Sequence, residues 1–368
     1  MGDKPNHRNK TGSPRRWSGQ RVSGTSTSVI VAIMVAASLV GALAVGLRGG
    51  AATASSSASS CAVGSAHCPS PAGFRSLAVP VVSSAQPVVP RYFASTNPFN
   101  QPVAASATQV VRATSIAAAL TRDPTADIYA YGEPVFSDVS TSTRTYNVRC
   151  SEPWGVCPLS RAPIPIPPDA TPSAGDDHAM VIVNPVTHLA YEMWRASRTP
   201  QGGWSAAWGA VVNTSGPGVT DVDGGPAGTG SGISSLAGLV TIAQLEAGSI
   251  PHALGFSSSL TCGSYVTPAD KSDGQTPPPG CIPEGARVQL NPSIDLAKIP
   301  GITPFELIVG RALQTYGAFA KDTGGASFAL SFETPHVGGD NPYKRLGVSA
   351  DYYAMPHLPW SQLRLVQG

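Results

Sequence analysis

An uncharged stretch of 19 residues, 29–47, constrains this chain more than any other feature. As a helix it spans about 28 Å, close to the roughly 30 Å hydrocarbon core of a bilayer. Six basic residues precede the stretch, and one, Arg48, follows it directly. Because positive flanks stay inside, residues 1–28 are predicted to be cytoplasmic and the rest of the chain to lie outside.

The stretch 29–47 fits two fates, which the sequence leaves open. It is longer than the apolar core of most signal peptides, which favours an uncleaved transmembrane anchor. The small residues Ala52-Thr53-Ala54 also fit a cleavage site, which would release the protein. The protein is therefore predicted to be anchored in the cell membrane or secreted, with an extracellular body in either case.

Residues 48–90 are rich in Ala, Ser and Pro and are predicted to form a disordered linker. The remaining residues, 91–368, contain no second stretch of this kind. With 42% hydrophobic residues in the chain, they have enough apolar material for one core. We therefore predict a single extracellular domain of two packed layers over 91–368.

The charge is distributed unevenly between the tail and the body. Seven of the 24 basic residues and one of the 22 acidic residues lie in 1–48, so the rest carries a net charge of −4. A mildly acidic body does not suit the phosphate backbone of a nucleic acid. We expect no nucleic-acid partner, and contact with the membrane only through the N-terminal helix.

The six cysteines follow an export signal and are even in number, so disulfides are expected. Of the 15 possible connectivities, local pairing is attractive because it closes three short loops: 61–68, 150–157 and 262–281. No two cysteines have the spacing of a zinc site. Asp221-Val222-Asp223-Gly224 resembles a calcium loop, but its twelfth position would be Gly232 instead of Glu. No cofactor is expected, and a metal is left open.

Gly and Pro together make up 74 of the 368 residues, and only 12% are charged. Many short strands and few helices are predicted, as in a β-sandwich or jelly roll with helical decorations. Turn residues 184–187 join predicted strands 178–183 and 189–196 into the clearest hairpin. A capping box at Thr303 with Pro304 predicts a helix to about residue 320. The other predicted elements include short helices over 115–120 and after Thr241, and strands over 127–135, 145–150, 208–213, 253–257, 286–290 and 327–332.

Several large enzyme classes are excluded by missing motifs. The sequence has no Gly-x-Ser-x-Gly elbow of the kind found in α/β-hydrolases. It also has no Walker loop, and Gly228-Thr229-Gly230-Ser231-Gly232 lacks the long helix that follows a dinucleotide fingerprint. Nucleotide-dependent chemistry is therefore not predicted.

Several sequence blocks lie within residues 97–333, and they include Asp177-His178, Tyr191-Glu192-Met193-Trp194, Gly238-Leu239-Val240, His252-Ala253-Leu254, Tyr316-Gly317 and Asp322. Together these blocks resemble a family of secreted bacterial proteins, mainly actinobacterial, that has no assigned activity. The resemblance implies an exported protein and supplies no mechanism. The chain departs from the family pattern at His188, where the turn usually has Gly.

Five side chains are candidate catalytic residues, each with a structural alternative. His178 follows two acids, and the register of its hairpin decides whether it shares a face with Glu192. Glu192 lies within an apolar strand, where a carboxylate is costly to bury unless it is paired. His252 enters another strand and offers an imidazole near neutral pH. Tyr316, near the end of a helix, and Asp322, just beyond it, complete the set.

These residues suit two kinds of polysaccharide chemistry. A lyase would need a base and an acid, for which His178 or His252 and Tyr316 are available. A hydrolase would use paired carboxylates, drawn from Asp177, Glu192 and Asp322. Three tryptophans around a Gly-rich turn would stack on sugar rings or fill the core; they are Trp194, Trp204 and Trp208.

The predicted function is therefore a cell-surface or secreted β-rich protein that acts on or binds extracellular or cell-wall polysaccharide. The alternative is a non-catalytic surface module with another partner. The arrangement of the candidates distinguishes the two. Catalysis or metal binding gains if His178, Glu192 and His252 meet in one cleft, and the binding module gains if they are scattered.

Overall fold

A computed structural model describes residues 89, 91–110, 114–336 and 341–367. The contacts of the chain divide it into two units, 1–79 and 80–368, and every described residue belongs to the second. The predicted cytoplasmic tail, the apolar stretch 29–47, nearly all of the linker and the 61–68 cysteine pair lie outside the described residues. Within the described ranges, no helix has both the length and the apolar character needed to cross a membrane.

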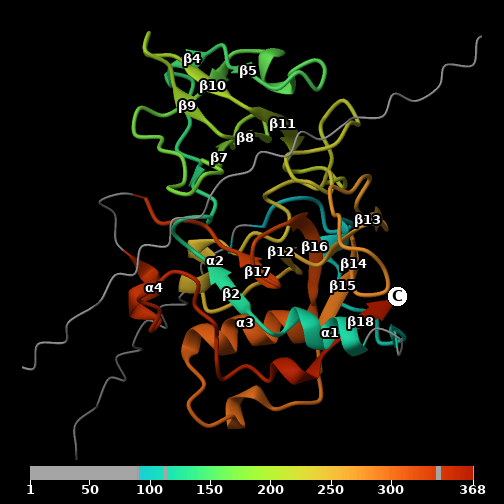
Figure 1. Ribbon diagram of the computed structural model, residues 1–368. Coiled ribbons are helices and arrows are strands. Elements are labelled where there is room, and N and C mark those ends of the chain that lie inside the picture. Colours follow the sequence, from blue (N-terminus) through green and yellow to red (C-terminus); the bar gives the residue numbers. More distant parts are fainter. Residues whose placement is uncertain (1–88, 90, 111–113, 337–340, 368) are drawn as a thin grey trace, which may run out of the picture. The chain divides into compact units, whose positions relative to one another are not determined.

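The described body is mainly β with a few short helices, as predicted. Its largest sheet has seven strands in the order β1-β18-β15-β16-β12-β17-β2, and it mixes parallel and antiparallel pairs. Helices α1 and α3 lie against this sheet (Figure 1). Its strands are β1 Thr108–Gln109, β2 Pro124–Asp127, β12 Leu254–Ser258, β15 Arg287–Leu290, β16 Ala318–Thr323, β17 Phe328–Ser331 and β18 Leu363–Gln367.

A second sheet of four strands has the order β11-β8-β7-β3, and three smaller sheets complete the described β structure. The four strands are β3 Val135–Phe136, β7 Met180–Asn184, β8 Leu189–Trp194 and β11 Trp208–Asn213. The smaller sheets pair β5 Arg149–Cys150 and β9 Ser197–Arg198 with β10 Trp204–Ala206, β13 Thr261–Tyr265 with β14 Ile282–Glu284, and β4 Thr145–Tyr146 with β6 Ile164–Pro165.

Helices are short, and two of them begin where capping residues predict them. Thr241 and Thr303 each form a capping box, at α2 and α3 respectively. The α-helices are α1 Thr114–Leu120, α2 Ile242–Glu246, α3 Pro304–Thr315 and α4 Pro342–Arg345; the 3-10 segments are η1 Pro98–Asn100, η3 Pro158–Ser160, η4 Leu296–Lys298 and η5 Trp360–Gln362.

The predicted hairpin is present as β7 and β8, and its register answers a question that the sequence left open. Asn184 closes the turn, because its side-chain oxygen accepts hydrogen bonds from Val186 N and Thr187 N. Val181 lies opposite Glu192, so the indices of paired residues have an odd sum. This register puts residue 178 on the opposite face of the hairpin from Glu192.

Three predicted elements differ from the observed ones. The predicted strand over 145–150 is divided into β4 and β5, which belong to different sheets. The helix from Thr303 ends at Thr315 instead of about residue 320, because Gly317 takes a left-handed φ of 68° and the chain then enters β16. Residues 127–135 are not one strand. Strand β2 ends at Asp127 and β3 begins at Val135, and bends and turns fill most of the interval.

Three apolar clusters hold the body together. The first packs α3, through Phe305 and Leu313, against the seven-stranded sheet. The second contains Val181 of β7 together with Phe319 of β16, and the third covers the other face of the hairpin around Met180. Both faces of the four-stranded sheet are therefore buried. Tyr191 and Met193, on either side of Glu192 in β8, belong to the third cluster. Because side chains alternate along a strand, Glu192 points to the opposite face of the sheet, where the second cluster lies.

Candidate functional site

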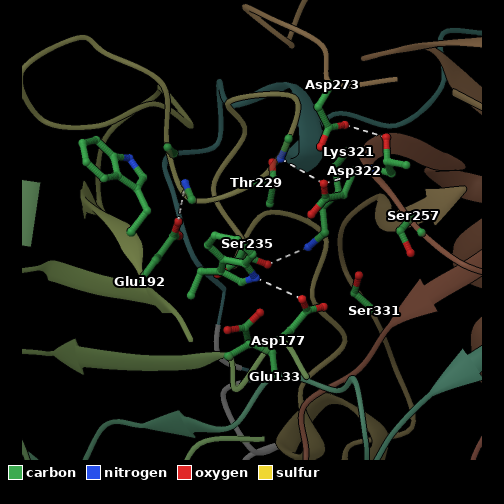
Figure 2. A pocket seen from close by; sticks show the side chains of 18 of the residues that line it. Glu133, Asp177, Glu192, Thr229, Ser235, Ser257, Asp273, Lys321, Asp322 and Ser331 are labelled. Atoms are coloured by element: carbon green, nitrogen blue, oxygen red, sulfur yellow. Dashed lines mark hydrogen bonds between the residues drawn. The ribbon is translucent and has the colours of Figure 1, made fainter. Parts of the chain in front are cut away.

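A cavity of about 1270 Å³ lies among β8, β11, β16, β17 and a Gly-rich segment, residues 225–230. Its wall carries carboxylates, two lysines and three tryptophans. Figure 2 shows the carboxylates of Glu133, Asp177, Glu192, Asp273 and Asp322 around Lys321. A cavity of this size holds several sugar rings or a comparable polar ligand. The side chains that define its chemistry come from segments far apart in the sequence, between Asp123 and Tyr352.

Glu133 offers the cavity a carboxyl group with a raised pKa. Its backbone is fixed by the segment after β17, because Glu133 N donates to Phe332 O over 2.9 Å. Burial raises the pKa of Glu133 to about 8; Lys321 opposes the rise, and Glu192 is the first of several carboxylates that add to it. This shift favours the protonated form, which is the form that acts as a general acid.

Glu192 is 2% exposed and holds the Gly-rich segment in place. Its carboxylate accepts hydrogen bonds from Gly228 N, over 3.0 Å, and from the Ser234 hydroxyl. A Cβ at Gly228 would come within 2.6 Å of Glu192 Oε2, so this approach needs glycine. Burial raises the pKa of Glu192, while these hydrogen bonds favour its charged form.

Lys321 places a buried ammonium among the carboxylates. It lies on β16 and donates from Nζ to Ser235 O over 2.7 Å and to Ala237 O over 3.4 Å (Figure 2). Burial lowers the pKa of Lys321, and Glu133 is the first of the acids that counter this effect. Lys321 therefore joins the central sheet to residues 235–237 and limits the pKa rise at Glu133.

Three tryptophans form an aromatic wall in the same cavity, which we call the tryptophan wall: Trp154, Trp194 and Trp208. Trp154 is 61% exposed and stacks on Trp194 with 5.9 Å between ring centroids; its ring lies 5.6 Å from that of Trp208. The Trp194 indole N–H donates to Asp177 Oδ1 over 3.0 Å. The apolar wall thus meets the acidic part of the cavity at Asp177 (Figure 2).

The predicted disulfides 150–157 and 262–281 are both present. The first closes the loop that carries Trp154, and the second closes the loop that carries Asp273. Disulfides of this kind fit an oxidising compartment such as the cell exterior. Trp204, by contrast, is buried in the third apolar cluster and does not line the cavity.

A second acidic group lies at one side of the cavity. Asp273, Glu284 and Asp322 each offer one carboxylate oxygen, and these oxygens lie within 4.8 Å of one another. Burial raises the pKa of both Glu284 and Asp322 to about 7, and Asp273 adds to each rise. Three converging carboxylates of this kind are typical ligands for a hard divalent cation.

The two carboxylates of the calcium-like stretch, residues 221–224, pair with Arg161. Asp221 Oδ1 lies 2.6 Å from Arg161 Nη1, and Asp223 Oδ2 lies 2.8 Å from Arg161 Nε. Asp221 Oδ2 also accepts from Val211 N over 2.8 Å. The guanidinium neutralises both carboxylates, so this segment acts as a structural ion-pair network.

The cavity brings together two of the five predicted catalytic residues, Glu192 and Asp322. Asp177, the third carboxylate of the predicted hydrolase set, also lines it. His178 does not line it: the residue is exposed, has a φ of 38°, and places Nδ1 3.1 Å from Ser173 O. The odd register of the hairpin accounts for its separation from Glu192.

His252 and Tyr316 also lie outside the cavity lining. The His252 ring nitrogens are within hydrogen-bond distance of Ala253 O and Gln244 Oε1. Burial lowers the pKa of His252 to about 4, which keeps the ring neutral at pH 7. Tyr316 ends α3 and packs on the second apolar cluster. The two histidines and Glu192 are therefore scattered, which removes the basis for a histidine base and favours the non-catalytic module over a lyase. A hydrolase that uses carboxylates alone does not need these histidines.

Three residues of the cavity were not among the predicted candidates. Glu133 lies in the segment expected to be a strand, and Lys321 follows the stretch that was assigned to the end of a helix. Trp154 lies between Cys150 and Cys157, in a loop that offered no periodic signal. Its place between two cysteines was the one available hint that it is held near other elements.

Comparison with known protein families, with curated proteins and with solved structures finds no match to this chain. The resemblance to secreted bacterial proteins therefore stays a prediction, and the function must be argued from the cavity.

Proposed function

We propose that this protein is exported and that its cavity binds and hydrolyses an extracellular polysaccharide. The observation that carries the proposal is the meeting, in one cavity, of the tryptophan wall with Glu133, a carboxyl whose pKa burial raises to about 8. Sugar rings have apolar C–H faces that stack on aromatic side chains, and glycosidic bonds break by acid catalysis from a carboxyl group. The lining of this cavity contains both an aromatic stacking surface and a carboxyl group that is suited to acid catalysis.

In the proposed reaction the Glu133 carboxyl donates its proton to the glycosidic oxygen as the C–O bond to the anomeric carbon breaks. A water molecule attacks that carbon and gives its proton to the Asp177 carboxylate, so one water is consumed for each bond cleaved. Asp177 suits the base because it is exposed and is oriented by the Trp194 N–H. Glu192 is fully engaged by the Gly-rich segment and serves as a positioning residue.

The compartment and the architecture belong to the same proposal. Two disulfides in the body support export, and the apolar stretch 29–47 supplies the signal or anchor for it. Membership of the secreted bacterial family is proposed on the blocks named above. A sandwich-like arrangement is supported by the second apolar cluster, which joins residues of β7 and β8 to Phe319 of the larger sheet.

Polysaccharide binding depends on Trp154 in this proposal. Replacing Trp154 with Ala is expected to raise the Kd for a bound polysaccharide about 10-fold or more, because a large exposed stacking surface is lost. Trp154→Tyr keeps a ring and should largely restore binding. Affinity electrophoresis of the full-length protein on a panel of cell-wall and plant polysaccharides measures the effect.

The same panel tests the proposal as a whole, with release of reducing ends as the second readout. Binding with release is expected from the wild-type protein. Binding without release of reducing ends from any polymer would exclude hydrolysis and favour the non-catalytic binding module. The exposed Trp154 also suits such a module. If Trp154→Ala bound polysaccharide as tightly as the wild-type protein, the tryptophan wall would not be the binding surface.

A further inference from the structure

We propose that Asp273, Glu284 and Asp322 bind one Ca²⁺ ion beside the cavity. The three residues come from separate segments: Asp273 from the loop after β13, Glu284 from the end of β14, and Asp322 from β16. One oxygen of each lies within 4.8 Å of the others. Ligands on opposite sides of a Ca²⁺ ion, at about 2.4 Å each, are separated by about 4.8 Å. The three oxygens therefore fit within one calcium coordination shell.

Glu284 supplies the independent indication of a ligand. Its side chain is 0% exposed, and neither carboxylate oxygen has a partner with hydrogen-bond geometry among the described residues. Ser272 and Asp273 lie close enough to shift its pKa, but the Ser272 hydroxyl donates to Cys262 O. Native proteins rarely leave a buried carboxyl without a partner, because water is lost and nothing replaces it. A cation at the convergence point with Asp273 and Asp322 would satisfy these oxygens.

The other two carboxylates are held so that part of each stays available. Asp322 Oδ1 accepts from Gly230 N over 2.9 Å and from Thr323 N over 3.0 Å. Asp273 Oδ1 accepts from the Thr323 hydroxyl over 2.5 Å. These hydrogen bonds all use the Oδ1 atom of each group. The pairing therefore orients both groups without using all of their oxygens.

Lys321 acts on Asp322 through its positive charge, but no ion pair found in the described body joins a cation to any of the three carboxylates. Lys271 donates to the carbonyls of Thr229 and Gly230, and Lys321 donates to Ser235 O. A hard cation with oxygen ligands supplies further positive charge, and Ca²⁺ accepts the carbonyl and water ligands needed to complete six to eight.

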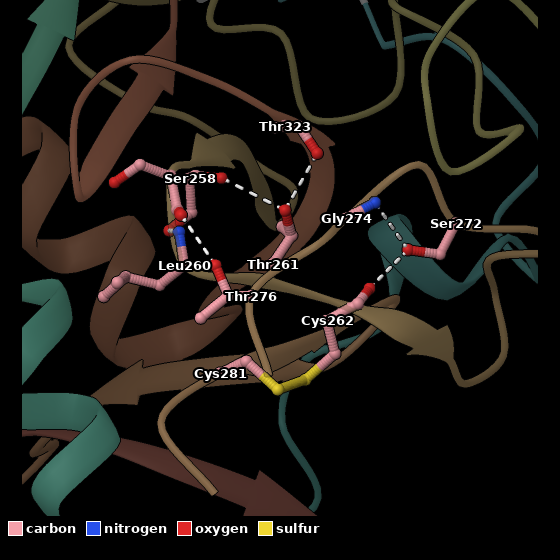
Figure 3. Close-up of a disulfide and its surroundings, with 10 residues drawn as sticks. Ser258, Leu260, Thr261, Cys262, Ser272, Gly274, Thr276, Cys281 and Thr323 are labelled. Atoms are coloured by element: carbon pink, nitrogen blue, oxygen red, sulfur yellow. Dashed lines mark hydrogen bonds between the residues drawn. A yellow bond between two sulfur atoms is a disulfide. The ribbon is translucent and has the colours of Figure 1, made fainter. Parts of the chain in front are cut away.

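The ion would link the disulfide loop to the central sheet. Figure 3 shows the Cys262–Cys281 disulfide, with the Ser272 hydroxyl donating to Cys262 O, and with Thr261 near Thr323 of β16. Asp273 follows Ser272 in this loop, so coordination would join the loop to β14 and β16 at one point. This role is structural and does not depend on the proposed hydrolysis.

The test is thermal unfolding and calorimetry of the full-length protein after treatment with a chelator. Added Ca²⁺ is expected to bind with one ion per chain and, at about 100 times its Kd, to raise Tm by about 5–10 °C. Glu284→Gln should abolish this rise, because it removes the buried charge. Asp223→Asn is the matched control: it changes the calcium-like stretch of the sequence and should keep the full response.

A second variant guards against misfolding of Glu284→Gln. Asp273 is exposed, so Asp273→Asn should fold normally and raise the Kd for Ca²⁺ at least 10-fold. The proposal is overturned if Ca²⁺ leaves Tm unchanged, if Asp273→Asn binds as tightly as the wild-type protein, or if Asp223→Asn removes the response. Equal stabilisation by Mg²⁺ would overturn the assignment to Ca²⁺. None of these readouts involves a polysaccharide.

Discussion

Replacing Glu133 with Gln is expected to lower kcat for polysaccharide cleavage by about 10³-fold, because the amide cannot donate the proton that the leaving oxygen needs. The Kd should change less than about three-fold, since the two side chains have nearly the same shape. Reducing-end release and affinity electrophoresis on the same polymer separate the two effects. Glu152→Gln, whose carboxyl does not line the cavity, should keep the wild-type kcat.

The proposed role of Glu133 also predicts how the cleavage activity changes with pH. The proton of Glu133 is the active species, and burial raises the pKa of this carboxyl to about 8. Activity should therefore fall as the pH rises through about 8 in the free enzyme, measured as kcat/KM. Wild-type activity in Glu133→Gln would exclude Glu133 as the acid. Residual activity of this variant that still falls as the pH rises through about 8 would exclude it as well.

Removing the Cys262–Cys281 disulfide has the second large expected effect. The bond joins residues 19 apart in sequence, and in the chain-entropy model its loss lowers the free energy of unfolding by about 3 kcal/mol. The double variant Cys262→Ser, Cys281→Ser should show this in urea denaturation. Because the loop also carries Asp273, the variant should bind Ca²⁺ more weakly as well.

The Cys150–Cys157 disulfide is the natural control, since it closes a shorter loop with a separation of 7. Replacing both of its cysteines with Ser should cost about 2.5 kcal/mol and should raise the Kd for polysaccharide, because Trp154 loses its fixed position. Calcium binding should be unaffected. A stability loss below about 1 kcal/mol for the 262–281 pair, or an equal effect of both disulfides on polysaccharide binding, would contradict this assignment.

Local signals in the sequence predicted the elements that local chemistry controls. The Asn184 turn gave the hairpin, and the Thr303 capping box with Pro304 gave the start of α3. Both devices satisfy backbone groups within a few residues of themselves, so no distant partner is needed to see them. The cysteine spacing likewise predicted two disulfides that close short loops.

Elements that depend on distant partners were mispredicted. Residues 318–320 were predicted to continue α3 because they are apolar, but Gly317 ends the helix and β16 is stabilised by β12 and β15, about 30–65 residues earlier in the chain. Glu133 reaches the cavity because its backbone pairs with Glu333, 200 residues later. Propensity carries no information about such pairings.

Only part of the candidate site was predicted, because its geometry also depends on partners that are distant in the sequence. Glu192 was identified because a carboxylate in an apolar strand needs a partner, and the structure supplies Gly228 and Ser234. His178 and His252 were selected by residue type alone. A change of one residue in hairpin register would have put His178 on the face of Glu192, and the turn sequence does not determine that register.

The most direct measurement is a crystal structure of full-length Glu133→Gln with an oligosaccharide of a polymer that the wild-type protein cleaves. The predicted result is a sugar ring stacked on Trp154 in the cavity, with a glycosidic oxygen about 2.6–3.2 Å from the side-chain amide at position 133. An oligosaccharide bound elsewhere on the protein, with the cavity free of sugar, would contradict the proposed function.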